Sequence, residues 1–464
     1  MVPTNEYLNT RTESSFIGSM FRKITEAVIV LMCCSIALYE SALGLMQVFG
    51  LRASGHAGFA LTGTFSNPGP YGGCIAVLLA VLASYAYMNR KSGSRCIRVM
   101  VVLSGVSAFM CFLVLPASMS RAAWLSFSVA ALVFAFREGR LAYWMSRYKG
   151  RTLIVSVALV VLLTGAFFMK KDSAIGRLHI WHMELRAIAE KPFSGHGKGS
   201  FLGVYGQTQA EYFSCPGIRS ETIIRVAGCP EYAFNEYLKI GVEYGIPAML
   251  AVIAILIFTF SLLVSRRSPF AYGLIALCVF AFFSYPLSAL QPKSEAEKEW
   301  ESLRYLSQME LYDDAVEEYA PFYEQLNDNY RFMYDYGYAL YKCGKYAESI
   351  MVLKEGTKIS SDPMFYNILG RNYEALGCYA DARYAYLHSH HMVPQRIYPL
   401  YLLMRMELRN NGNDEAVKYG EMIMKVPVNK KHRTMIRLRS ETQQLLDSLM
   451  PPPARSEIDR YSPR

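Results

Sequence analysis

The order of apolar and polar positions divides the chain into two parts. Residues 24–290 hold long apolar runs with few Lys, Arg, Asp or Glu residues, whereas residues 293–464 are rich in charged side chains and tyrosine. A run of about 20 apolar residues can cross a bilayer as a helix. Seven runs are candidates, at 24–50, 70–88, 97–117, 121–137, 152–169, 236–264 and 270–290. The pattern predicts an all-α protein, with a polytopic bundle of about seven transmembrane helices followed by a soluble helical part.

Basic residues cluster at alternate ends of these runs, at 22–23, 90–98, 137–151 and 266–267. Because basic residues favour the cytoplasmic side, we expect the N-terminus to be cytoplasmic and the long loop at 170–235 to face outward. Seven spans then place the C-terminal part outside as well. A miscounted span would invert that placement, and the weakest of the seven is the short run that begins at Arg121.

The C-terminal part repeats every 33 or 34 residues. Turns precede small residues at Ala315, Ser349, Ala382 and Ala416, and Gly337 and Gly370 stand twelve residues before two of them. This period is typical of tetratricopeptide repeats, whose small residues let paired helices approach closely. We expect a tail at 1–23, a transmembrane domain at 24–292, an α-solenoid at 293–440 and a tail at 441–464. The solenoid either binds a protein partner or docks against its own membrane domain.

The net charge of +10 does not indicate nucleic-acid binding, because the excess flanks the apolar runs and no base-reading motif is present. No cysteine spacing predicts a metal site, and no Asp-x-Asp pair predicts a metal-dependent nucleotide-sugar site. Cys215 and Cys229 in the outward loop either form a disulfide or remain free thiols. The string GHGKGS at 195–200 lacks phosphate-loop spacing, and we interpret it as a glycine-rich turn.

Four strings, in this order, resemble the O-antigen ligase and polymerase family: GTFSNPGPYGG at 63–73, SMSRAAWLSF at 118–127, RLHIWHMELRAIAEKPFSGHGKGSF at 177–201 and FNEYLKIGVEYGIP at 234–247. The string FAFFSYPL at 280–287, with the appended repeats, resembles a subgroup from Bacteroides-like bacteria. The resemblance implies a multi-pass glycosyltransferase of the bacterial inner membrane with periplasmic repeats. It would move a glycan from undecaprenyl diphosphate to an acceptor hydroxyl on the periplasmic face, without metal, nucleotide or other cofactor. The acceptor would be lipid A core, a polysaccharide or a protein.

Two arginines are candidates for contact with the donor diphosphate, because a guanidinium stays charged and its fork matches phosphate oxygens. Arg121 stands at an expected outward membrane boundary, and Arg177 opens the string of the outward loop. In the alternative interpretation, Arg121 only extends its charged end to the membrane interface, and Arg177 is only a cation at a helix end.

An acceptor hydroxyl needs a base or an orienting hydrogen-bond acceptor. In the family a histidine commonly precedes Asn or Ser at the start of the helix after the long loop. Here Phe234 takes that place and is followed by Asn235 and Glu236. We predict that Glu236 and Asn235 lie near the acceptor and that His182 can supply an imidazole. Glu231, Glu243, His179 and His196 are weaker candidates.

The residues Asn67, Pro68, Gly69 and Pro70 predict an irregular turn, with the next helix starting on Pro70. In the first apolar run, Glu40 and Gln47 lie on nearly the same helix face, and a buried carboxylate there requires a partner. Both fit the family pattern, and an interhelical hydrogen bond is the simpler interpretation.

Family members usually carry several more membrane helices than this chain. The shorter bundle, together with Phe234, leaves an alternative function open. In that hypothesis the chain is a non-catalytic, membrane-anchored repeat scaffold for envelope polysaccharide assembly.

Overall fold

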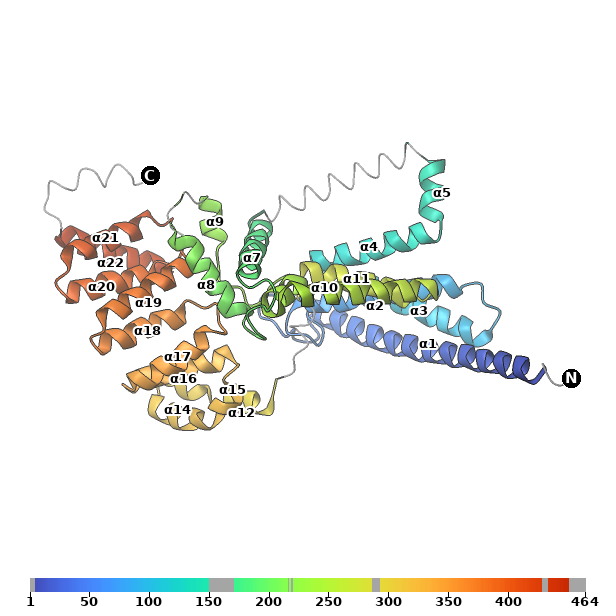
Figure 1. The fold of residues 1–464 in the computed structure, drawn as a ribbon, viewed down its shortest axis with the longest axis horizontal. Coiled ribbons are helices and arrows are strands. Elements are labelled where there is room, and N and C mark those ends of the chain that lie inside the picture. Colours follow the sequence, from blue (N-terminus) through green and yellow to red (C-terminus); the bar gives the residue numbers. More distant parts are fainter. Residues whose placement is uncertain are drawn as a thin grey trace. The chain divides into compact units, whose positions relative to one another are not determined.

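The computed structural model describes residues 5–148, 150, 171–215, 217, 220–285, 293–427 and 433–449 (Figure 1). These residues form an all-helical protein in which no strand occurs. The chain divides into two compact units. The first unit comprises 1–164, 234–237 and 250–291, and the second comprises 165–233, 238–249 and 292–464.

The helices of the first unit include several that are long and apolar. Among the described residues, four stretches are long and apolar enough to cross a membrane, namely Lys23–Val48, Pro68–Asn89, Arg95–Ser118 and Glu236–Ser265. The elements are α1 (Asn5–Val48), α2 (Pro68–Asn89), α3 (Arg95–Val114), η1 (Pro116–Ser118), α4 (Arg121–Arg137), α5 (Arg140–Arg147), most of α10 (Glu236–Ser265) and α11 (Phe270–Phe283). The expected spans at 121–137 and 270–290 correspond to the shorter helices α4 and α11. The expected span at 152–169 lies outside the described residues, so the count of seven stays a prediction.

Helix α2 is the centre of the first unit and packs against α1, α3, α4 and α11. Two glycines near its start allow this close packing. A Cβ at Gly73 would overlap the ring of Phe280, and one at Gly72 would lie 2.8 Å from Ser120 Cβ. Around these contacts, α2 contributes Tyr71 and Ile75 to a core that also includes residues of α1, α3 and α4.

Helix α10 leaves large apolar side chains exposed along its length, among them Leu250, Ile255 and Phe258. None of its most apolar stretch is buried within the protein. A continuous apolar surface of this kind is unfavourable in water and favourable in lipid. Together with the other long apolar helices, it indicates a membrane protein.

The second unit begins with α7 (Lys171–Glu190), α8 (Phe201–Ser214) and α9 (Glu221–Val226), and it includes residues 238–249 of α10. Its remaining elements follow Pro292. They are α12 (Glu295–Leu303), α13 (Tyr305–Gln308), α14 (Tyr312–Tyr319), η3 (Ala320–Phe322), α15 (Tyr323–Leu326), α16 (Tyr330–Lys342), α17 (Tyr346–Thr357), α18 (Met364–Ala375), α19 (Tyr379–Met392), α20 (Tyr398–Arg409), α21 (Asn413–Lys425) and α22 (Arg433–Leu449).

From α16 to α22 each helix packs on the next across a short turn or connection (Figure 1). The small residues of the repeat lie where paired helices meet. A Cβ at Gly337 of α16 would lie 2.6 Å from Leu353 of α17, and a Cβ at Gly370 of α18 would overlap Tyr386 of α19. Ala382 is fully buried. The spacing of small residues thus produces a stack of helical hairpins.

The described part of the expected outward loop packs on these hairpins within the second unit. Helix α8 lies against α19, and the Gln209 amide donates to the carbonyls of Met392 and Gly228. Gly203 lies so close to the backbone of Lys358 that a Cβ would overlap it. The loop helices and the repeat helices therefore form one compact body.

Candidate functional site

The turn before α2 is held by two polar residues of α1. Glu40 is 5% exposed and accepts hydrogen bonds from Thr64, at 3.1 Å from the backbone N–H and 2.5 Å from the hydroxyl. Gln47 Oε1 accepts the N–H groups of Thr62 and Gly63 at 3.0 and 2.8 Å, and its Nε2 donates to the Gly63 carbonyl at 3.0 Å. Both side chains therefore bond the loop rather than a neighbouring helix.

Gly63 is needed in this turn for two reasons. Its φ is +59°, a left-handed conformation that side chains disfavour, and a Cβ there would overlap Glu40 Oε2 and the Tyr71 ring. The Tyr71 hydroxyl also donates to the Glu40 carbonyl at 3.2 Å. The first helix, the turn and the start of α2 are thus joined through buried contacts.

The helix after the turn begins two residues earlier than predicted. Asn67 is the N-cap of α2, and its Oδ1 accepts the N–H of Gly69 at 2.9 Å. Pro68 therefore opens the helix, where a missing N–H costs nothing, and Pro70 stands inside the first turn. The prediction of a start at Pro70 was wrong because the asparagine before Pro68 already provides the cap.

Arg121 is the first residue of α4 and is exposed. Ser120 caps this helix by accepting the N–H of Ala123 at 3.4 Å, and it lies against Gly72 of α2. The preceding Met119 has a φ of +53°. The turn that presents Arg121 is therefore packed beside the start of α2, and Arg121 adds a cation where the α4 dipole already favours an anion.

Tyr285 connects the start of α10 with the Asn-Pro-Gly-Pro turn in the first unit. The rings of Phe234 and Tyr285 meet edge to face with centroids 5.3 Å apart, and the Tyr285 hydroxyl lies 3.5 Å from the Cβ position of Gly69. Phe234 has a φ of +56°, which is unusual for an aromatic residue. The first unit thus brings together the Asn-Pro-Gly-Pro turn and the start of α10.

Asn235 and Glu236 are 1% and 5% exposed. Asn235 Oδ1 accepts the N–H of Tyr237 at 3.1 Å, so its amide oxygen helps to start α10. Glu236 follows as the first residue of α10, where a carboxylate is favoured by the helix dipole.

Two of the strings that carry the resemblance fit each other in the second unit. Helix α10 breaks at Gly245, with φ +84°, and Pro247 lacks an N–H. The carbonyls of Val242 and Glu243 instead accept the N–H groups of His196 and Gly197 at 2.8 and 3.0 Å. The segment 195–200 is therefore a turn that caps a broken helix.

Arg177 and His182 both lie on α7 in the second unit. Arg177 is half-buried, whereas His182 is exposed with its ring 5.9 Å from that of Tyr212. The other two histidines of this region make structural contacts. His179 is buried with its Nε2 2.9 Å from Gln209 Oε1, and His196 Nε2 lies 2.8 Å from the Ala187 carbonyl.

Burial lowers the pKa of His179, and its hydrogen bond to Gln209 opposes that change. The neutral ring is therefore favoured there.

Glu184 is a buried carboxyl that the sequence did not single out. It is 1% exposed beside Met183, Ala187 and Ile188, and neither carboxyl oxygen has a hydrogen-bond partner among the described residues. Burial raises the pKa of Glu184 well above its usual range. Burial therefore favours the protonated form of this carboxyl over the charged form.

Neither a disulfide nor a metal centre forms within the part of the chain that the structure describes. Cys215 and Cys229 are free, which favours the thiol alternative. No group of three or more His, Cys, Asp or Glu side chains is placed to hold a metal ion there.

Residues 106–253, about a third of the chain, match the family model of the O-antigen ligases. This range contains three of the four strings that carry the resemblance, including Arg121, Arg177 and Glu236. The match supports the family and a function of the O-antigen ligase or polymerase type. A search of curated proteins finds no match to the chain.

Sequence reasoning missed the two left-handed residues, Met119 and Phe234, that precede predicted site residues. Nothing in their side-chain types indicates a positive φ. It also missed the role of Tyr285, which connects two strings far apart in the chain. Only the position of Tyr285 in the FAFFSYPL string pointed to it.

Proposed function

We propose that this chain is an inner-membrane glycosyltransferase of the O-antigen ligase and polymerase type. It transfers a glycan from undecaprenyl diphosphate to an acceptor hydroxyl on the periplasmic face. The observation that carries the proposal is the match of residues 106–253 to the O-antigen ligase family. The joined Asn-Pro-Gly-Pro turn, Arg121 turn and start of α10 support it, because they gather polar groups at one end of apolar helices.

The proposed reaction is a direct displacement that inverts the anomeric carbon. The acceptor oxygen forms a bond to that carbon as the bond to the diphosphate oxygen breaks. Arg121 and Arg177 hold the diphosphate, whose charge grows as it leaves. The acceptor proton passes to Glu236, with Asn235 and His182 orienting the acceptor. The chain needs no metal or cofactor in this proposal.

In the same proposal, the membrane bundle has about seven spans with a cytoplasmic N-terminus, and the hairpins α16 to α22 form a periplasmic tetratricopeptide solenoid. The burial of Gly337, Gly370 and Ala382 at helix pairs supports the repeat assignment. Lipid A core, a growing polysaccharide and a protein side chain are the acceptor classes that this function allows.

The test is complementation of a strain that lacks the chain, with surface glycans read by gel electrophoresis. Arg121→Ala is compared with Arg98→Ala, which removes an exposed arginine from the first turn of α3. We expect wild type and Arg98→Ala to restore the glycans and Arg121→Ala to fail at equal expression. Full restoration by Arg121→Ala would overturn the assignment.

A second candidate function is a non-catalytic scaffold, and Phe234 at the place of the family's histidine favours it. The anchored repeats would then recruit an envelope-assembly protein. Crosslinking from the repeat helices in cells separates the two functions. A stoichiometric protein partner captured without any donor lipid supports the scaffold, whereas a chain that restores glycans alone supports the transferase.

A further inference from the structure

The second unit contains a pocket that the reaction described above does not use. Its volume is about 450 Å³, within the range of small-molecule sites. The segment 229–231 and Leu202 of α8 form part of its lining, and the other lining residues follow Pro292 in the chain, among them Arg304, Tyr330 and Asp335.

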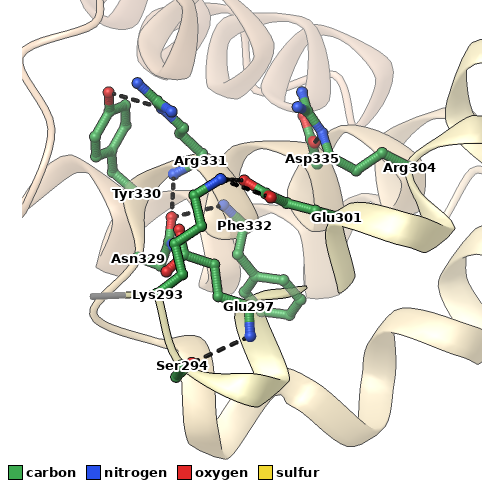
Figure 2. Close-up of polar contacts among 10 residues, drawn as sticks. All are labelled: Lys293, Ser294, Glu297, Glu301, Arg304, Asn329, Tyr330, Arg331, Phe332 and Asp335. Carbon is green, nitrogen blue, oxygen red and sulfur yellow. Dashed lines mark hydrogen bonds and ion pairs between the residues drawn. The ribbon is translucent and has the colours of Figure 1, made fainter. Parts of the chain in front are cut away.

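Four of the five charged residues that line the pocket are paired with each other, and the fifth, Asp362, has its Oδ1 3.7 Å from Arg396 Nη1. Arg304 Nε donates to Asp335 Oδ2 at 2.7 Å, and Figure 2 shows these two side chains pointing toward one another. Arg331 Nη2 lies 3.4 Å from Glu231 Oε1, while its Nε donates to the Tyr330 hydroxyl at 3.1 Å. The pocket therefore offers many donors and acceptors with little net charge. This disfavours a strongly anionic or cationic ligand.

Aromatic rings stand beside these polar groups. Tyr330 and Tyr334 lie one turn apart on α16, and both are half-buried. Phe365 of α18 also lines the pocket, with its ring 5.4 Å from that of Tyr334. Asn329 fixes the start of α16 by accepting the N–H groups of Arg331 and Phe332 (Figure 2). Flat apolar faces next to paired charges suit a ligand that has C–H faces and a rim of hydroxyls.

The segment 227–231, which includes the lining residues 229–231, is held by several contacts to the connections between the repeat helices. The Ser361 hydroxyl donates to the Pro230 carbonyl at 2.9 Å, and the Gln395 amide donates to the Ala227 carbonyl at 3.0 Å. Arg396 also reaches Cys229 Sγ at 3.4 Å. The segment ends three residues before Phe234 in the chain.

We propose that this pocket binds an uncharged segment of a glycan, through Tyr330 and Tyr334 and the polar rim of Arg304, Asp335 and Glu231. That the bound glycan is the acceptor, or part of the growing chain, rests on the function proposed above. Glycan binding by the pocket does not depend on that function.

The experiment uses the full-length chain in detergent micelles. The probes are oligosaccharides of two to six sugars, released by mild acid from the surface polysaccharide of the cells that make the chain. Saturation-transfer NMR reports which sugar protons contact the protein. A pentapeptide of alanine and serine serves as the competing protein-like probe.

Two variants and one control test the pocket. Tyr330→Ala removes a ring, and Glu231→Gln removes one charged acceptor from an exposed side chain without changing its shape. The control Tyr384→Ala removes a tyrosine of α19 that is 67% exposed and outside the pocket. Melting temperatures confirm that each variant is folded.

We expect the oligosaccharides to bind wild type and the Tyr384→Ala control equally. Tyr330→Ala should weaken binding by about tenfold or more, and Glu231→Gln should weaken it to a smaller extent. No saturation transfer to any fraction, equal binding by folded Tyr330→Ala, or preference for the pentapeptide would overturn the proposal. Because the readout is binding, loss of glycan transfer in cells leaves this result unaffected. Conversely, transfer that persists in a chain whose pocket binds no glycan refutes only the pocket.

Discussion

The aromatic ring of Phe234 meets that of Tyr285 edge to face, with centroids 5.3 Å apart. Phe234 makes this contact from a left-handed backbone conformation, with φ +56°. Strained residues of this kind persist only where their surroundings hold them, and they concentrate at functional sites. Phe234 precedes Asn235 and Glu236, so the strain supports a functional role for the start of α10.

The strain at Phe234 can be measured by comparing two substitutions. Phe234→Ala and Phe234→Gly both lose the ring. The left-handed backbone conformation is unfavourable for alanine but not for glycine. We expect the glycine variant to be more stable than the alanine variant by about 1 kcal/mol. Thermal unfolding of both variants in the same detergent checks this. Equal stability would show that the backbone at this position is not strained.

The turn that caps the broken helix α10 depends on close approach at Gly195. A Cβ there would lie 2.5 Å from the carbonyl group of Glu243, and φ is +66°. Gly199 has a similar φ of +74° but no heavy atom within 4 Å of its Cβ position. We expect Gly199→Ala to cost about 1–2 kcal/mol through the backbone alone, and Gly195→Ala to cost clearly more.

Unfolding midpoints of the two glycine variants are the measurement, with wild type as the reference. If Gly199→Ala were as damaging as Gly195→Ala, the close approach to Glu243 would not contribute. The backbone conformation would then explain both losses.

Glu184 should make stability depend on pH. Its pKa in the folded chain is raised by burial, so the folded state holds the proton more tightly than the unfolded state. The resulting stabilisation is complete below the ordinary glutamate pKa. It is lost as the pH rises from there through the raised folded value. We therefore expect Glu184→Gln to gain stability relative to wild type as pH increases.

Melting temperatures of wild type and Glu184→Gln across pH 5 to 8 test this prediction. Glu190→Gln, at the exposed end of the same helix, is the control and should follow wild type. Parallel curves for wild type and Glu184→Gln would contradict a raised pKa of Glu184 in the folded chain.

Much of the helical architecture could be predicted from the sequence, since it depends on local patterns. The apolar runs locate α1, α2, α3 and α10, because a membrane-crossing helix needs a long continuous stretch. The small residues of the repeat likewise locate the helix pairs. The spacing of Glu40 and Gln47 correctly predicted that they share one helix face. It did not predict that they bond the loop before α2, because spacing contains no information about partners.

The features that the sequence could not give depend on contacts between distant segments. Tyr285 and Gly69 meet although more than two hundred residues separate them. The pocket likewise combines residues 229–231 with Tyr330 and Asp335. The start of α2 was misplaced for a local reason, because two prolines fit the first turn and only the cap at Asn67 decides between them.

We propose above that the chain transfers a glycan with help from Arg121. Its most direct test uses purified full-length chain, a glycan on radiolabelled undecaprenyl diphosphate and an acceptor extract, and measures release of free undecaprenyl diphosphate. We predict that wild type and Arg98→Ala release it together with elongated acceptor, whereas Arg121→Ala loses at least about a hundredfold in rate. Release by Arg121→Ala at the wild-type rate would show that Arg121 has no role in the transfer.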